Sequence, residues 1–240
     1  MSDDTLTPIL ELLRQGELSS EGLLPWSSNY TFLMRVCGAD EEIQAVYKPR
    51  RGERPLWDFP SGTLCSRECA AFILSQAAGW HLVPPTVLRR GPQGVGSLQW
   101  FVPHNPEEHY FTFEGQFPDQ VQRMVLFDVL VNNADRKSGH VLLGESNRLW
   151  GIDHGICFHT DYKLRTVIWE YAGIPIPPDQ LAELAELQQT LALSQPLRHE
   201  LAQHLRPEEI TAIENRLAQL LQAGKFPEPG PGRHYPWPLV

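Results

Sequence analysis

The stretch NNADRKSGHVLL, from Asn132 to Leu143, determines how the rest of the chain is interpreted. It is a polar loop set between apolar segments. Before it, DQVQRMVLFDVLVNN (119–133) is apolar on most sides from Met124 to Val131, which predicts a buried helix. After it, HVLL (140–143) and LWGID (149–153) predict two short strands separated by the turn GESN. A loop fixed between buried elements can present Asp135 and His140 for chemistry.

The first hundred residues predict a small antiparallel sheet with one inserted helix. TLTPILELLR (5–14) has helical spacing, and TFLMRV (31–36) and IQAVYKP (43–49) predict strands on either side of a turn. CSRECAAFILSQAAG (65–79) predicts the inserted helix. PPTVLRR (84–90) and SLQWFV (97–102) predict two more strands. The intervening GPQGVG (91–96) precedes a strand and not a helix, so it is interpreted as a hairpin turn and not as a nucleotide-binding glycine loop.

The second half is mainly helical. Helices are expected over 178–192, 196–205 and 207–223, while FPEPGPGRHYPWPLV (226–240) is too rich in proline and glycine to be regular. The fold class is therefore α+β, with a small antiparallel β lobe followed by a helical lobe. We expect a single two-lobed domain over 1–240, divided into a β-rich lobe (1–103), a helical lobe (104–225) and a Pro-rich tail (226–240). A cleft between lobes is a usual place for a small-molecule site.

Composition limits the partners. The chain has 20 basic and 29 acidic residues and a formal charge of -9, which argues against nucleic acid or an anionic membrane surface as the main partner. The local exception is KPRRGER (48–54), which is a basic patch or simply a solvated loop. The four cysteines form no CxxC pair, as expected of reduced thiols in a cytoplasmic protein. Neither a signal peptide nor an apolar run of about 18 residues occurs, so no stable membrane anchor is expected.

Five charged or polar residues fall in an order that protein kinases use. Lys48 ends a predicted strand, Glu68 lies on the following helix, and Asp135 follows the buried helix. His140 comes five residues later, and Asp153 follows the last predicted strand, in GIDHG. Kinases pair a strand lysine with a helix glutamate to hold nucleotide phosphates, and add a catalytic-loop aspartate and a metal-binding aspartate. Each residue alone is commonly an edge lysine, a solvated glutamate or a turn former, so the prediction rests on their order and context.

Three motifs carry a family resemblance. SSNYTFLMRV…AVYKP, NNADRKSGHVLL and GIDHGICF resemble the phosphatidylinositol 3-/4-kinase-like family, an atypical branch of the protein-kinase fold. The motifs are most similar to those of type II phosphatidylinositol 4-kinases. YKPRRGERPLWDFPSGTL and VIWEYAGIPIP further resemble a compact bacterial subfamily of that fold. The resemblance extends over roughly residues 20–175.

The resemblance implies roles for the nucleotide-binding residues. Lys48 would bind the α- or β-phosphate of ATP, and Glu68 would orient Lys48. The phosphate loop would be formed by Ser27, Ser28 and Asn29. The adenine would meet the backbone near Gln99, Trp100, Phe101 and Val102.

It also implies roles for the residues around the catalytic loop. Asp135 would position or deprotonate the attacking group, and Arg136 would be structural or catalytic. Asp153 would coordinate the metal that bridges the phosphates. His140 stands where the family usually has asparagine. Magnesium prefers oxygen ligands, whereas manganese tolerates imidazole, so His140 binds a different metal, binds none, or contacts a phosphate.

The function predicted on these grounds is an ATP-dependent phosphotransferase that uses Mg²⁺ or Mn²⁺. Its acceptor is left open among a protein side chain, a sugar, an inositol compound and a lipid. A catalytically impaired nucleotide-binding pseudokinase or scaffold is the main alternative. Nucleotidyl transfer is another, and so is a metallohydrolase with a site built from His140, Asp153, His154 and His159.

Overall fold

A five-stranded antiparallel sheet forms the N-terminal part of the structure. The computed structural model describes residues 3–24, 30–39, 41–230 and 232–240. The strand order in the sheet is β1-β2-β3-β5-β4. The strands are β1 (Glu17–Leu23), β2 (Phe32–Cys37), β3 (Glu42–Pro49), β4 (Thr86–Gly91) and β5 (Gly94–Trp100). Because β3 is paired on both sides, a side chain on it is held in a fixed register.

One face of this sheet is covered by helix α1 (Asp3–Gln15), and a small separate core lies between them. The alternate strand residues Met34, Val36, Ala45 and Tyr47 are buried there with Leu13 of α1. The predicted hairpin is confirmed, since two residues join β4 to β5. Gly94, the first residue of β5, has φ +101°. Strand β1 was not predicted, because all but one of its residues are exposed and it lacks the alternation that marks a strand.

The remaining helices form the second part of the molecule. They are α2 (Leu64–Ala77), α3 (Pro118–Val131), α4 (Pro178–Leu193), α5 (Gln195–Ala202) and α6 (Pro207–Ala223). A two-stranded sheet of β6 (Val141–Gly144) and β7 (Arg148–Gly151) follows α3 and supports the loop between them. The predicted α+β architecture is confirmed. Within the described residues, no helix combines the length and apolar character needed to cross a membrane.

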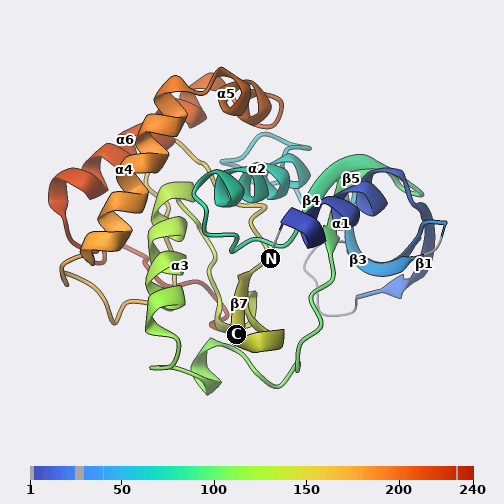
Figure 1. The fold of residues 1–240 in the computed structure, drawn as a ribbon, viewed down its shortest axis with the longest axis horizontal. Coiled ribbons are helices and arrows are strands. Elements are labelled where there is room, and N and C mark those ends of the chain that lie inside the picture. The colour runs from blue at the N-terminus through green and yellow to red at the C-terminus, as the bar shows by residue number, and fades with distance from the viewer. Residues whose placement is uncertain (1–2, 25–29, 40, 231) are drawn as a thin grey trace.

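Helix α2 lies between the sheet and the other helices (Figure 1). Its residues Leu64–Ser75 are buried, and they include both apolar and charged side chains. Ala70, Ala71, Phe72, Ile73 and Leu74 belong to the large core shared with α3, α4, α5 and α6. Helix α2 lies before residue 103, the predicted end of the β-rich lobe, yet it packs with helices that come after that residue. The proposed division into lobes stays a prediction.

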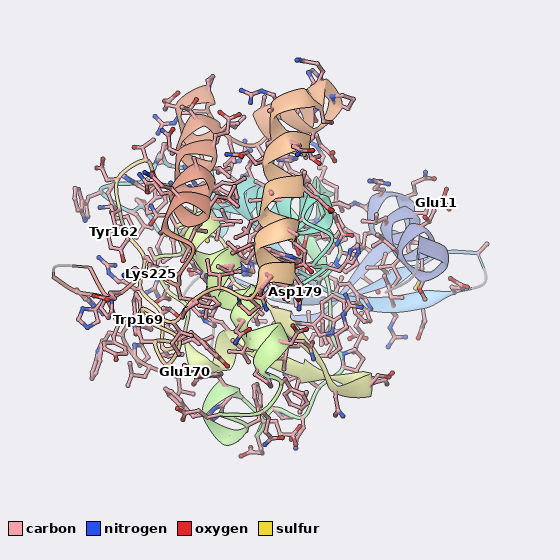
Figure 2. All side chains as sticks on the ribbon, turned by 60° about the vertical axis from the view of Figure 1, so that its left-hand side comes forward. Glu11, Tyr162, Trp169, Glu170, Asp179 and Lys225 are labelled. Atoms are coloured by element: carbon pink, nitrogen blue, oxygen red, sulfur yellow. The ribbon has the colours of Figure 1, made fainter. Side chains whose placement is uncertain are left out.

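The segment after α6 folds back along the helical part. Ser138 N–H donates to the carbonyl of Leu239 (2.8 Å), and Thr166 N–H donates to the carbonyl of His234 (3.1 Å). Figure 2 shows Trp169 and Lys225 on the side of the molecule away from Glu11 of α1. The described part of the tail has no helix or strand, as its proline and glycine content predicted. It nevertheless contacts the loop that carries Asp135.

Candidate active site

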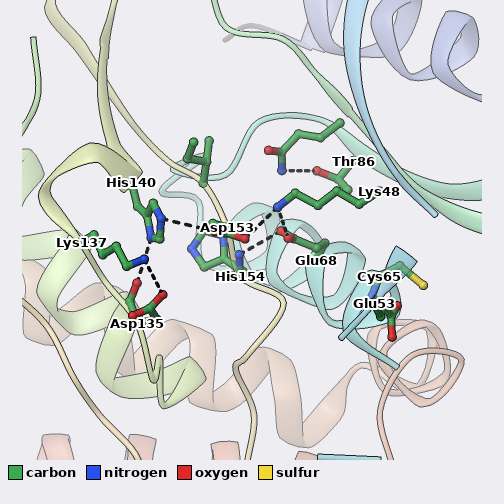
Figure 3. A network of polar contacts seen from close by, with 12 residues as sticks. Lys48, Glu53, Cys65, Glu68, Thr86, Asp135, Lys137, His140, Asp153 and His154 are labelled. Carbon is green, nitrogen blue, oxygen red and sulfur yellow. Dashed lines mark hydrogen bonds and ion pairs between the residues drawn. The ribbon is translucent and has the colours of Figure 1, made fainter. Parts of the chain in front are cut away.

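Lys48 is held between two carboxylates, as Figure 3 shows. Its Nζ lies 2.5 Å from Glu68 Oε1 and 2.9 Å from Asp153 Oδ1. Strand β3 supplies Lys48, helix α2 supplies Glu68, and Asp153 lies two residues after β7. The other oxygen of Glu68, Oε2, accepts the N–H of His154 at 2.9 Å. Residues separated by more than one hundred positions are thus joined in one network.

The groups of this network and their burial shift the pKa values in different directions. Burial opposes the charge on Lys48, but Asp153 and Glu68 outweigh it and raise the pKa of Lys48. Lys48 in turn lowers the pKa of Asp153, which stays ionised. Burial raises the pKa of Glu68, against the attraction of Lys48. Asp153 also has a left-handed backbone (φ +62°), a strained conformation of the kind found at functional sites.

Asp135 lies in a loop that starts at the end of α3. Asn132 caps this helix in a left-handed conformation (φ +52°), and the side-chain oxygen of Asn133 accepts the N–H of Asp135 at 2.9 Å. Lys137 Nζ lies 3.4 Å from Asp135 Oδ2. Burial raises the pKa of Asp135 to about 6, although Lys137 opposes the shift. A carboxyl with such a pKa can take up a proton near neutrality.

Arg136 follows Asp135 in the chain, and its side chain is fully buried. Its guanidinium donates to Asp128 Oδ2 at 2.9 Å and to the carbonyls of His140 (2.9 Å) and Ile152 (3.0 Å). Another nitrogen, Nη2, lies 2.7 Å from His154 Nε2. Arg136 therefore connects α3 to the backbone next to His140 and Asp153.

His140 faces Asp153. Its Nδ1 lies 2.9 Å from the carbonyl oxygen of Asp135, which can only accept, so the proton is on Nδ1. The unprotonated Nε2 then lies 3.3 Å from Asp153 Oδ2. Burial lowers the pKa of His140 to about 4, so the ring is neutral at pH 7.

This pair of donors fits a divalent cation. A neutral imidazole nitrogen and a carboxylate oxygen point at each other, both with lone pairs and neither with a proton to share. Over the described residues, no group of three or more His, Cys, Asp or Glu side chains is placed to hold a metal. Two protein ligands suit a nucleotide-bound metal, because Mg²⁺ and Mn²⁺ take their remaining oxygens from phosphates and water.

The segment predicted to meet adenine runs from the end of β5 into a loop. Trp100 N–H donates to Pro85 and Phe101 N–H donates to Gln44. The amide side chain of Gln99 is bonded to Thr86. In the described chain, the N–H of Val102 makes no hydrogen bond. The side chain of Val102 packs in a small apolar cluster with Leu142 and Trp150.

Two further groups of residues were predicted to form sites. Ser27, Ser28 and Asn29 lie outside the described residues. Of the four residues considered for a metallohydrolase, His154 has its Nε2 against Arg136, and His159 faces Asp161. The His140 and Asp153 side chains of that set face each other. The geometry gives the metallohydrolase alternative no support.

Lys137 and Asp128 of the network were not predicted from the sequence, and His154 was considered as a metal ligand. Lys137 follows Asp135 by two positions, and a lysine so close to a catalytic-loop aspartate was a usable signal. Asp128 is hidden in the apolar helix, where its spacing of eight residues from Arg136 carries no pattern. His154 acts through its backbone N–H, which no side-chain motif reveals.

Comparisons with known proteins show that the chain is a kinase. The family model for phosphatidylinositol 3- and 4-kinase matches residues 87–214, which includes Asp135, His140 and Asp153 but not Lys48 or Glu68. The Golgi casein kinase with Mn/ADP bound superposes with a TM-score of 0.60 at 17% identity, over 93% of this chain and 76% of that one.

The chain belongs to the phosphatidylinositol 3- and 4-kinase family. Protein Rv2133c of Mycobacterium tuberculosis is 39% identical over 262 aligned positions, which cover 95% of this chain and 94% of the relative. Phosphatidylinositol 4-kinase gamma 2 of Arabidopsis thaliana is 29% identical over 72% of this chain. The match covers only 39% of the plant protein's length, so the chain corresponds to a part of that relative.

Proposed function

We propose that this kinase transfers the γ-phosphoryl group of ATP to an acceptor hydroxyl with the help of Mg²⁺ or Mn²⁺. The observation that carries the proposal is the meeting of Lys48, Glu68 and Asp153 from three elements distant in the chain. The Mn/ADP complex of the Golgi casein kinase supports the choice of nucleotide and metal. A membrane lipid, an inositol compound, a sugar and a protein side chain all remain candidates for the acceptor.

The nucleotide would bind across the network. Lys48 would exchange its contact with Asp153 for an α- or β-phosphate oxygen while Glu68 keeps it in place. Asp153 and His140 would then be free to hold the metal, which supplies charge neutralisation between the phosphates. The free N–H of Val102 would donate to the adenine, beside the apolar surface of Leu142 and Trp150. Ser27, Ser28 and Asn29 stay candidates for the phosphate loop.

The transfer step would take place at Asp135. The acceptor oxygen forms a bond to the γ-phosphorus as the bond from that phosphorus to the β,γ-bridging oxygen breaks, and ADP leaves with the electron pair. The acceptor proton passes to Asp135, whose pKa of about 6 suits a general base near neutral pH. Lys137 would stabilise the charge on the transferred group from its position beside Asp135. Of the two roles left open for Arg136, structural and catalytic, we assign the structural one because the side chain is fully buried.

The test is to incubate the pure protein with ATP and either Mg²⁺ or Mn²⁺, and to identify the products by mass spectrometry. ADP with a phosphorylated product indicates phosphoryl transfer, whereas addition of AMP indicates nucleotidyl transfer. We expect Asp153→Ala to lose metal-dependent ATP binding, and Asp135→Asn to keep binding but lose turnover. Asp161→Asn is the matched control, since the Asp161 side chain is 82% exposed. If both site variants bound and turned over ATP like the parent, the proposal would be wrong.

A further inference from the structure

The helix that carries Glu68 packs on two sides, against β4 and β5 of the sheet and against the helical region. Ala71, Phe72 and Leu74 of α2 lie in the large core with α3 and α6, while the sheet has its own core with α1. Lys48 and Glu68 therefore come from different elements, strand β3 and helix α2, and the position of α2 decides whether the two side chains meet. What fixes α2 in the helical region also fixes Glu68.

Arg67, the residue next to Glu68, makes a buried ion pair with helix α6. Its side chain is 2% exposed, and its Nη2 lies 2.6 Å from Oε1 of Glu209, which is equally buried on α6. Its Nη1 donates to the carbonyl of Cys157 at 2.6 Å. The second oxygen of Glu209 accepts the N–H of Arg206 at 2.9 Å. A charged pair buried to this extent, with further hydrogen bonds at each end, gives a specific geometry.

Adjacent residues on α2 are thus tied to the helical region in two directions. Successive side chains on a helix point about 100° apart. Arg67 is bonded toward α6 and Cys157, and Glu68 toward the N–H of His154. Two attachments at this angle oppose both rotation of α2 about its axis and translation away from the core.

We propose that Arg67 and Glu209 are positioning residues that hold Glu68 in place to receive Lys48. Loss of the Arg67–Glu209 contact would loosen α2 and with it the Lys48–Glu68 contact. The consequence for ATP binding rests on the function proposed above, whereas the consequence for the Lys48–Glu68 contact does not.

The perturbation removes both buried charges together. Arg67→Met/Glu209→Gln removes both charges, so no unpaired ion remains in the core. A single substitution would leave one unpaired ion there, which is costly. The glutamine introduced in place of Glu209 also keeps an oxygen to accept the N–H of Arg206. The matched control is Arg123→Met/Glu183→Gln, which removes an ion pair of 2.7 Å between α3 and α4.

The main readout is the rate at which an amine-acylating reagent modifies Lys48 in the nucleotide-free protein, measured by peptide mass spectrometry. Exposed Lys225 is the internal reference. We expect the ratio of Lys48 to Lys225 modification to rise at least about twofold in the Arg67/Glu209 variant, the lower end of coupling between neighbouring residues. The control pair should leave the ratio unchanged. A purely structural contribution would lower the melting temperature of both double variants without changing this ratio.

The affinity for ATP with Mn²⁺ is measured on the same proteins and is expected to fall in the Arg67/Glu209 variant alone. An unchanged labelling ratio in that folded variant overturns the inference. If the parent fails to bind ATP while the ratio still rises, the proposed function fails and the positioning role stands. If the double variant does not fold, Arg67→Lys replaces it. This variant keeps the charge but cannot reach both partners, so an intermediate ratio is expected and a parental one refutes the proposal.

Discussion

Replacing Asp128 by asparagine should destabilise this protein more than most single substitutions. Asp128 is 1% exposed on α3, and its carboxylate accepts from Nε and Nη2 of Arg136 at 2.9 Å each. It also accepts from the side-chain amide of Asn133 at 2.9 Å. Asparagine removes the negative charge and turns an N–H₂ group or a single oxygen toward a guanidinium that has no access to water. Breaking one side of a buried ion pair costs about 3–5 kcal/mol.

That cost can be measured as a shift in melting temperature. For a chain of this size, each kcal/mol lowers the melting temperature by about 2–4 °C, so Asp128→Asn should lower it by about 6–20 °C. Glu183→Gln is the control, because Glu183 pairs with Arg123 where both side chains are partly exposed. A pair of that kind is worth at most about 1 kcal/mol, or about 4 °C.

Scanning calorimetry of the two variants and the parent decides the matter. If Asp128→Asn lowers the melting temperature no more than Glu183→Gln does, then Asp128 does not compensate the buried charge of Arg136. The same variant should also lose ATP turnover well below its melting temperature. Arg136 bonds the carbonyls of His140 and Ile152, which lie at and next to the proposed metal ligands.

Two further predictions concern the chemistry of the site. His140→Asn replaces an imidazole by an oxygen ligand, so the ratio of ATP turnover with Mn²⁺ to that with Mg²⁺ should fall; an unchanged ratio would remove His140 from the metal site. ATP turnover should decline as the pH falls through about 6, because Asp135 must lose its proton to act as a base. Lys137 lowers the pKa of Asp135, so Lys137→Met should move this decline to higher pH; a decline that stays in place would assign it to another group.

The elements of the fold were predictable where the sequence has a clear period. The helices of residues 178–223 and the hairpin at Gly91–Gly94 follow from apolar spacing and glycine. Strand β1 was missed because an exposed edge strand needs no apolar side chains to form its hydrogen bonds. The packing of α2 was also beyond prediction. Its residues are buried on nearly all sides, so its sequence does not show which neighbours it joins.

The residues of the candidate site could be proposed from the sequence, but the contacts that hold them in place could not. Lys48 and Glu68 are recognisable because they lie on a predicted strand and helix, and Asp135 and Asp153 because they follow predicted elements, all in a kinase-like order. The contacts that hold them come from buried charges and backbone groups. Nothing in the sequence pairs Arg67 with Glu209, 142 positions apart, because the pairing depends on how the fold places α6 relative to α2.

The packing of α2 also decides which parts of the chain unfold together. Because its side chains complete the core of α3 and α6, its backbone amides should exchange with solvent only when that whole core opens. The smaller core between α1 and the sheet should open at a lower free energy than the large core. Helix α2 is therefore expected to unfold together with helices that lie after β4 and β5 in the sequence. A fragment cut between α2 and β4 would lack the helix that fills its interior, although every later helix is present.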